Sequence, residues 1–203
     1  MKRFVLGWGL ILLNIFLSAC IGVEMRFVFN TTGAGRFIFK YKVSEEMRGF
    51  TDASSSANNV LPDISLKTIE KKIKENPALK LIALNQSEDE KNIYINGEIE
   101  FNSLEALQKS GMVYFPCSLK QEGNRSVFRI MYVHNREKVD AKLLDLIRLL
   151  FADYKLQIIV EAPRKIADSS EGSLSNDGRT LTLVYKMEDY LQLAGDQELR
   201  VSW

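Results

Sequence analysis

The first 19 residues constrain the fold most, because they have the pattern of a targeting segment that does not belong to the folded domain. Lys2 and Arg3 form a short basic start, and the apolar run Phe4–Phe16 follows. This layout, closed by small residues, is typical of a secretory signal that is removed from the mature protein. We therefore expect residues 1–19 to lie outside the fold, and residues 20–203 to form a single domain outside the cytoplasm.

The segment ends in the tetrapeptide Leu17-Ser18-Ala19-Cys20. This tetrapeptide resembles the lipobox of bacterial lipoproteins, in which a branched apolar residue and two small residues precede a cysteine. Small side chains admit the peptidase to the bond before Cys20, and the thiol then carries the lipid. The resemblance implies cleavage before Cys20, a diacylglycerol thioether and an N-linked acyl chain such as palmitate. Several acyl chains anchor a protein stably in the cell membrane or outer membrane.

A second interpretation of the same segment is an uncleaved membrane anchor. No charged residue occurs over Phe4–Val23, a stretch of 20 residues that is long enough to cross a bilayer. Either interpretation places the rest of the chain outside the cytoplasm and tethered to a membrane. A strand pattern begins at about Gly22, so we expect the folded domain to sit close to the lipid surface.

The composition excludes several classes of function. The chain has 203 residues, 46% hydrophobic and 26% charged, which suits one globular domain. Loss of residues 1–19 removes two basic residues and no acidic one, which changes the net charge from +1 to −1. This balance gives no support to a nucleic-acid partner. Cys20, Cys117 and His134 are the only cysteines and histidine, so neither a Cys/His zinc cluster nor a disulfide framework is available. We expect no metal and no cofactor.

Alternation of apolar and polar residues predicts antiparallel hairpins. The first covers residues 23–43, with a turn at Thr31–Gly35 and an aromatic-rich apolar face. The second covers residues 113–133, where a turn centred on Glu122 and Gly123 would place Cys117 opposite Phe128. Further strands are expected over residues 79–84, 93–101, 156–160, 179–186 and 199–203.

Helical spacing of apolar residues predicts several helices between these strands. The strongest pattern is Val139–Tyr154, which carries a wide apolar stripe. Shorter helices are expected over residues 44–50, 65–76, 103–110 and 187–193, and residues 51–62 read as a loop. Because strands and helices do not alternate strictly, we predict the α+β class: a largely antiparallel sheet built from hairpins, packed by two or three amphipathic helices.

Residues 162–191 carry a distinctive order of turns. Pro163, Ile166 and Gly172 precede the turn Asn176-Asp177-Gly178, which leads into a Thr-rich strand ending at Tyr185. This order resembles the end of the LppM-type domain of bacterial envelope proteins. The resemblance implies an α+β envelope domain, with lipid as one candidate ligand, and it transfers no catalytic residue to this chain.

Cys117 and His134 are the only thiol and imidazole outside the anchor, so a nucleophilic dyad has to be considered. The predicted register separates them by six residues of strand, about 20 Å, which is beyond contact. Cys117 also shares an apolar face with Phe115 and Leu119, which favours a buried structural thiol. We expect His134 to be an exposed loop residue without a catalytic role.

Other patterns are interpreted as structural. Gly33-Ala34-Gly35 lies between two strands and is a turn rather than a phosphate loop. Glu88-Asp89-Glu90 lacks the spacing of a calcium loop and is expected in a solvated turn. Glu98 and Glu100 would face outward from a strand. A basic cluster is expected on a solvated helix face, with anionic headgroups as an alternative partner, and it consists of Lys71, Lys72, Lys74 and Lys80.

These observations favour a membrane-anchored, non-enzymatic envelope lipoprotein without catalytic residues. It would bind either a lipid or other hydrophobic ligand, or an envelope protein partner. One alternative is a membrane-proximal hydrolase that uses carboxylates which the sequence does not single out. A purely structural role in the envelope is the other.

Overall fold

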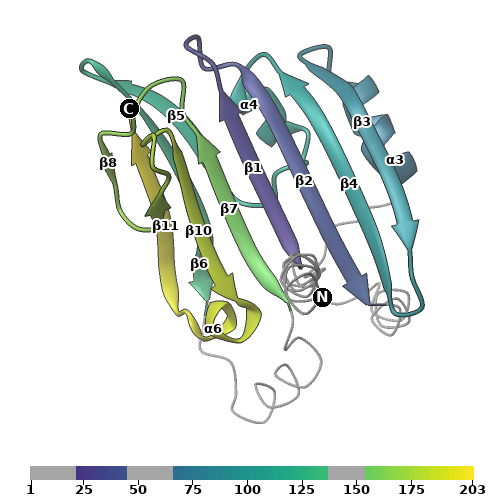
Figure 1. Ribbon diagram of the computed structural model, residues 1–203. Coiled ribbons are helices and arrows are strands. Elements are labelled where there is room, and N and C mark those ends of the chain that lie inside the picture. Colours follow the sequence, from purple (N-terminus) through teal and green to yellow (C-terminus); the bar gives the residue numbers. More distant parts are fainter. Residues whose placement is uncertain (1–21, 45–65, 137–153) are drawn as a thin grey trace, which may run out of the picture.

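The structure is a computed structural model, and it describes residues 22–44, 66–136 and 154–203. Within these ranges two β-sheets pack against each other, and short helices pack against strands of both sheets (Figure 1). Hairpin strands dominate, and the described part contains three helices. The predicted α+β class is therefore confirmed.

The large sheet is mixed. Its antiparallel hairpins are joined by one parallel pair, in which Val23 of β1 lies opposite Leu156 of β7. The hydrophobic pattern of each strand did not indicate this parallel pairing, which joins segments far apart in the chain. The seven strands follow the order β3 (Leu79–Glu88), β4 (Asn92–Phe101), β2 (Gly35–Ser44), β1 (Val23–Phe29), β7 (Lys155–Glu161), β10 (Thr180–Lys186) and β9 (Ser173–Leu174).

The small sheet contains the second predicted hairpin, with a different register. Cys117 lies opposite Ile130 and not opposite Phe128, so the prediction was wrong by two residues. The cause is the turn: Glu122 pairs with Arg125, and Gly123 takes a positive φ of 60° in a two-residue connection. The four strands follow the order β5 (Cys117–Glu122), β6 (Arg125–Arg136), β11 (Gly195–Ser202) and β8 (Asp168–Ser169).

Three predicted helices are confirmed within the described ranges. α3 (Leu66–Lys74) buries Ile69 and Ile73 against β3. α4 (Leu104–Lys109) lies behind β1 and β2 in Figure 1, and α6 (Met187–Gln192) follows β10. The apolar residues of α3 recur at helical spacing, so one face packs on the sheet while the lysines remain in water.

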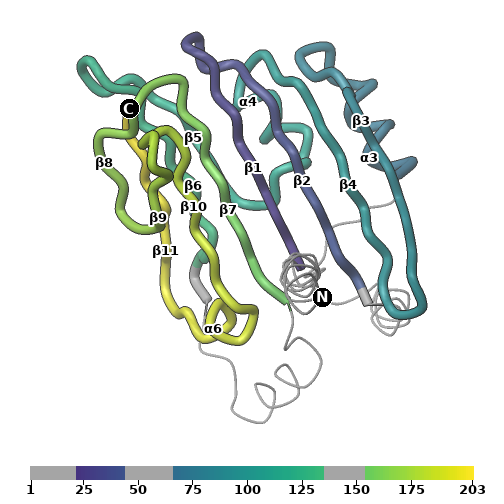
Figure 2. Tube along the Cα trace, viewed as in Figure 1, coloured from purple at the N-terminus to yellow at the C-terminus, as the bar shows by residue number. Residues whose placement is uncertain are grey.

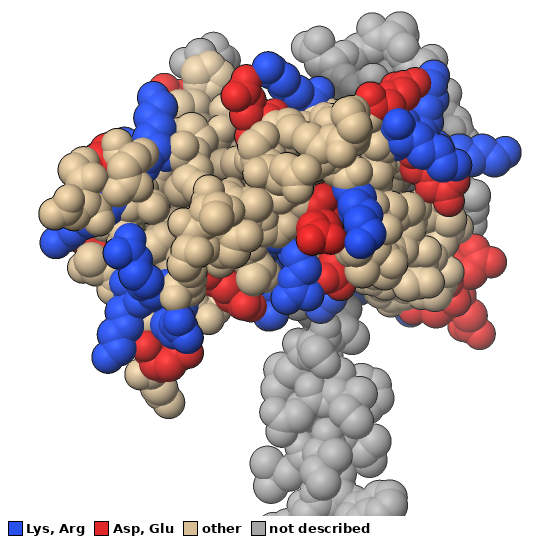
Figure 3. Space-filling view, turned by 90° about the horizontal axis from the view of Figure 1, so that it is seen from above, with Lys and Arg blue, Asp and Glu red and all other residues tan. Residues whose placement is uncertain are grey.

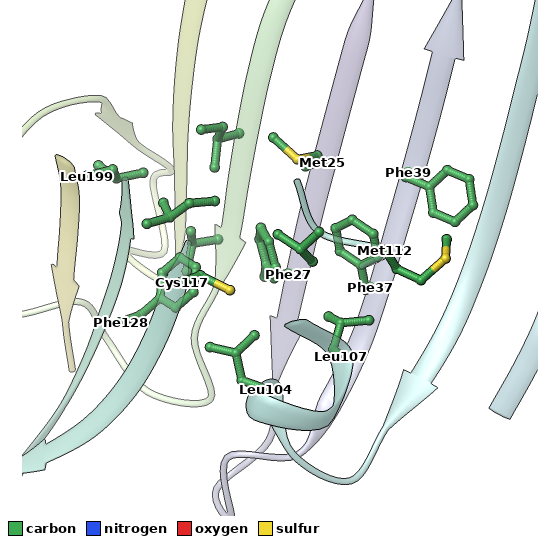
Figure 4. Close-up of a cluster of buried hydrophobic side chains, with 14 of the residues drawn as sticks. Met25, Phe27, Phe37, Phe39, Leu104, Leu107, Met112, Cys117, Phe128 and Leu199 are labelled. Atoms are coloured by element: carbon green, nitrogen blue, oxygen red, sulfur yellow. The ribbon is translucent and has the colours of Figure 1, made fainter. Parts of the chain in front are cut away.

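Aromatic side chains form the core between the sheets. The ring of Phe128, from the small sheet, lies 5.1 Å from the ring of Phe27 and 5.2 Å from that of Phe29, both in β1. Figure 4 shows how Leu104 and Leu107 of α4 complete this cluster. Burial of each such side chain contributes roughly 1.5–3 kcal/mol, so these contacts hold the two sheets together.

The opposite face of the large sheet carries charged side chains in pairs. Arg26 bonds Glu161 at 2.9 Å, and Arg36 bonds Glu98 at 2.8 Å. Figure 3 draws a different surface, the end of the molecule that carries the β1–β2 turn, and basic and acidic side chains are interspersed there as well. That surface therefore resembles an ordinary solvated surface more than a binding face for a polyanion.

The direction of β1 gives the domain two distinct ends. Val23 lies at one end of the large sheet, and the β1–β2 turn lies at the other (Figure 2). The six residue steps of β1 span about 20 Å. Several predicted segments lie outside the described residues: the signal 1–19, Cys20, residues 45–50 of the helix expected at 44–50, the loop 51–62 and most of the helix Val139–Tyr154. Ser44, the expected start of the 44–50 helix, is instead the last residue of β2.

Candidate functional site

A groove of about 390 Å³ opens at the end of the molecule that carries the β1–β2 turn. Three segments that are distant in sequence form its walls: the turn itself, the start of α4 and the first part of β5. Both polar and apolar side chains line it, among them Thr32, Asn102, Leu104, Gln108, Cys117 and Leu119.

The β1–β2 turn forms the first wall, and its own hydrogen bonds hold its shape. The Asn30 side-chain oxygen accepts hydrogen bonds from the Thr32 backbone N–H at 2.9 Å and from its hydroxyl at 2.7 Å. The chain then approaches itself so closely at Gly35 that a Cβ would lie 1.9 Å from the Val28 carbonyl oxygen. Only glycine fits at position 35, so this close approach fixes the position of the turn.

α4 forms the second wall. The Ser103 hydroxyl accepts from the Ala106 backbone N–H at 3.2 Å and caps the start of the helix. Leu104 and Leu107 are buried in the core, which fixes the rotation of the helix. Gln108 is therefore held on the side of α4 that faces β5.

β5 forms the third wall and is an outer strand of the small sheet. The Met131 backbone N–H donates to the Pro116 carbonyl, and hydrogen-bonded pairs alternate along an antiparallel ladder. The N–H and C=O groups of Cys117, Leu119 and Gln121 therefore point away from β6.

At Cys117 a side chain takes the place of a neighbouring strand. In the amide orientation that satisfies both groups, the Gln108 nitrogen donates to the Cys117 carbonyl at 2.6 Å. The Gln108 oxygen accepts from the Cys117 N–H at 3.2 Å. No comparable group of the described residues bonds the backbone of Leu119, which lies at the groove.

Glu105 and Lys120 are charged side chains that line the groove, and they differ in their ion pairing. Glu105 pairs with Lys109 at 2.6 Å, and this hydrogen bond lowers the pKa of the Glu105 carboxyl. Lys120 is exposed at the groove, and within the described ranges no carboxylate forms an ion pair with it. Among the residues that the structure describes, Lys120 therefore places an unpaired positive charge at the β5 side of the groove.

The predicted burial of Cys117 is confirmed. Its side chain belongs to the core cluster beside Leu104 and Phe128 (Figure 4), and burial raises the pKa of the thiol to about 12. The thiol is therefore neutral near pH 7 and is a poor nucleophile.

His134 lies apart from Cys117. It is four residues along β6 from Ile130, the partner of Cys117, which corresponds to about 13 Å. The predicted loop position was wrong, because β6 continues through His134 to Arg136. The side chain is exposed as predicted, and its Nδ1 lies 3.1 Å from an Asp196 carboxylate oxygen.

The other candidates also lie away from the groove. Glu98 and Glu100 face outward as predicted, and each pairs with a basic side chain. Asp89 lies in the β3–β4 turn and accepts from the Lys91 N–H and the Tyr94 hydroxyl, which lowers its pKa to about 2. The predicted basic cluster is divided. Lys80 pairs with Glu100 on the outer face of the sheet, while Lys71, Lys72 and Lys74 lie in the last turn of α3.

A polar cluster that no pattern in the sequence indicates joins the two sheets. Glu171 accepts hydrogen bonds from Tyr132 of β6 at 2.5 Å and from Tyr185 of β10 at 2.7 Å. Burial and then the Glu171 hydrogen bond raise the pKa of Tyr132, and burial raises that of Tyr185. Both phenols therefore stay protonated and act as donors that tie the β8–β9 connection to both sheets.

In the described ranges, no three His, Cys, Asp or Glu side chains gather closely enough to hold a metal ion. None of the described helices combines the length and the apolar character that a bilayer crossing requires.

The comparisons with known proteins give a distant likeness. No protein-family model matches the chain, and no curated protein matches its sequence. Among solved structures, the folded domain of the LppM protein of Mycobacterium tuberculosis is similar with a TM-score of 0.42 and 12% identity. The alignment covers 89% of this chain and 86% of that one. The domain is of the type that residues 162–191 resemble, but a likeness this distant assigns no function.

Proposed function

We propose that the chain is a lipid-anchored protein of the bacterial cell envelope, and that its folded domain is a non-enzymatic binding module. The groove between the β1–β2 turn, α4 and β5 is its binding site. The observation that carries this proposal is the course of β1, which begins at Val23, three residues after Cys20, and ends at Phe29 next to the turn that walls the groove.

This course sets the distance between the anchor and the groove. Residues 20–23 span at most about 10 Å, so a lipid on Cys20 holds the start of β1 near the bilayer. The strand then carries the groove about 20 Å farther along the sheet. We propose that β1 runs away from the bilayer, so that a lipid would have to leave the membrane to reach the groove. This orientation favours a protein partner over a lipid ligand.

The chemistry of the described residues supports binding over catalysis. The Cys117 thiol stays protonated in the core, and His134 lies about 13 Å away along β6. The carboxylates Glu98 and Glu100 are held in ion pairs on a different face from the groove. A hydrolase would need an activated nucleophile or a general base at its site. At the groove, the Cys117 thiol is protonated and the Glu105 carboxylate is held by Lys109, so neither residue is prepared for that role.

The anchor is tested by labelling cells with an alkyne-bearing fatty acid. The wild type should take up the label, and its intact mass should lack residues 1–19 and include the lipid. Cys20→Ala should lose the label and accumulate as the longer precursor. Cys117→Ala is the matched control, since Cys20 and Cys117 are the only two cysteines, and it should keep the label. Label that persists on Cys20→Ala, or a wild type that retains residues 1–19, would refute the proposal.

A further inference from the structure

We propose that the open edge of β5 binds an extended peptide segment of a partner protein, which adds to the small sheet as a further strand. This inference rests on the proposed function, because it names the occupant of the same groove. It is carried by the backbone of β5, by Gln108 and by the shape and charge of the groove walls.

The backbone of β5 supplies the hydrogen-bonding groups. The N–H and C=O groups of Leu119 and Gln121 point away from β6 with the two-residue repeat that a neighbouring strand requires. The β5–β6 register runs from Cys117 to Glu122 without a shift, so this edge is regular. A peptide that pairs with both residues gains four main-chain hydrogen bonds, which is the usual source of affinity in strand addition.

Gln108 shows what chemistry this edge accepts. Its side-chain amide makes with Cys117 the two hydrogen bonds that a peptide unit of a neighbouring strand would make. The planar amide thus occupies the first position of an added strand, and Leu119 and Gln121 follow as the next two. A ligand with repeated amide groups continues this pattern, whereas an acyl chain offers no donors or acceptors to it.

The walls of the groove select a single extended chain. The turn lies so close that a Cβ at Gly33 would be 3.1 Å from Leu119 Cδ2, and α4 stands on the other side. A second copy of the domain would bring a whole sheet to this edge, and the turn and α4 would obstruct it. Lys120 adds a preference of its own, because its unpaired charge favours an acidic side chain on the added segment.

A random peptide library displayed on phage provides the probe. We would select it against the full chain, purified from membranes in detergent, and synthesise the enriched peptides. Hydrogen–deuterium exchange read at single residues would then compare the free and the peptide-bound protein. We expect a bound peptide to protect the N–H groups of Leu119 and Gln121. Those of Ser118 and Lys120, which already pair with β6, should change little.

Proline variants test the same contacts by affinity. Leu119→Pro and Gln121→Pro each remove an N–H from the open edge, and each should weaken peptide binding about tenfold. Gln86→Pro is the matched control, since it removes an outward N–H from the other long edge, β3, and it should bind the peptides like the wild type. The exchange measurement on the wild type decides the question if Leu119→Pro does not fold.

Three results would overturn the inference: no peptide is enriched, protection appears away from β5, or the β5 proline variants bind as tightly as the wild type. Each differs from a failure of the proposed function, which would appear as an unlipidated Cys20. Peptide protection at Leu119 without a lipid on Cys20 would refute the anchor and leave the β5 site standing.

Discussion

β3 closes one side of the large sheet and β5 closes one side of the small sheet, and their outer backbone groups have different surroundings. β3 is interrupted by a register shift between Leu81 and Ala83, which leaves Ile82 bulged and 46% exposed. Its last four residues, 85–88, are polar and exposed. β5 is regular, and a groove and the Gln108 amide lie along it.

This difference indicates that the two edges meet different requirements. Bulges and exposed charges are common ways to stop an edge strand from pairing with other chains. β3 has both, whereas β5 carries the exposed charges of Lys120 and Glu122 but no bulge. β8 and β9, at the opposite sides of the sheets, have only two residues each. Among the described strands, β5 thus remains the regular edge with room for another chain, and the following predictions test that contrast.

The largest effect is expected in the core that supports both edges. Phe27 is fully buried and contacts Phe37 and Phe128, so Phe27→Ala should lower the free energy of unfolding by about 3–5 kcal/mol. Val28→Ala, on the other face of the same strand, is the control and should cost about 1 kcal/mol or less. Urea denaturation measures both. Equal costs would contradict the assignment of the two faces of β1.

Removal of the Gln108 amide should affect β5 specifically. Gln108→Ala leaves the Cys117 N–H and C=O without their partner, and we expect a loss of about 1–2 kcal/mol in unfolding free energy. Gln86→Ala removes the same type of side chain from the exposed edge of β3 and should change stability by less than about 0.5 kcal/mol. If the two variants lose the same unfolding free energy, the Gln108 amide does not supply the hydrogen bonds that a neighbouring strand would supply to Cys117.

The Cys117 thiol gives a prediction at alkaline pH. Its pKa is raised to about 12 in the folded protein, from a usual value of 9.0, so folding favours the protonated form. The corresponding stability is present below pH 9 and is lost as the pH rises towards 12. The unfolding free energy of the wild type should therefore fall relative to that of Cys117→Ala over this window. A constant difference would show that the thiol is not buried beside the groove.

The smallest effect is expected at the β3–β4 turn. Hydrogen bonds from the Lys91 N–H and the Tyr94 hydroxyl lower the Asp89 pKa to about 2, from 3.8. The lowered pKa contributes stability above pH 3.8, and this is lost as the pH falls through about 2. Thermal melting should show a small advantage over Asp89→Asn near pH 5 that shrinks towards pH 2. A stability advantage of the wild type that grows as the pH falls would contradict the lowered pKa of Asp89.

Much of the fold followed from local patterns in the sequence. Alternation located β1, β2 and β4, and helical spacing located α3 and α4, because one buried face imposes its period on each element. The predicted register of the second hairpin was wrong by two residues. The alternation of apolar and polar residues is compatible both with a turn at Glu122 and Gly123 and with one at Gly123 and Asn124, so it does not choose between them. The actual turn places Gly123 where a positive φ is required.

The groove could not be predicted in the same way. Its walls come from segments near residues 32, 104 and 119, and only the packing of the two sheets brings them together. The Ser103 cap and the Leu104–Leu107 spacing indicated α4, but not that Gln108 faces a strand edge. Likewise, no local pattern pairs Glu171 with Tyr132 and Tyr185, since these residues belong to three separate elements.

The central claim is that β5 offers an open, regular edge, and amide exchange in the free protein tests it most directly. In the full chain without added peptide, the N–H groups of Leu119 and Gln121 should exchange quickly, and those of Ser118 and Lys120 slowly, in strict alternation along the strand. Slow exchange at all four positions would show that another segment already covers this edge, and the account of β5 as a binding site would be wrong.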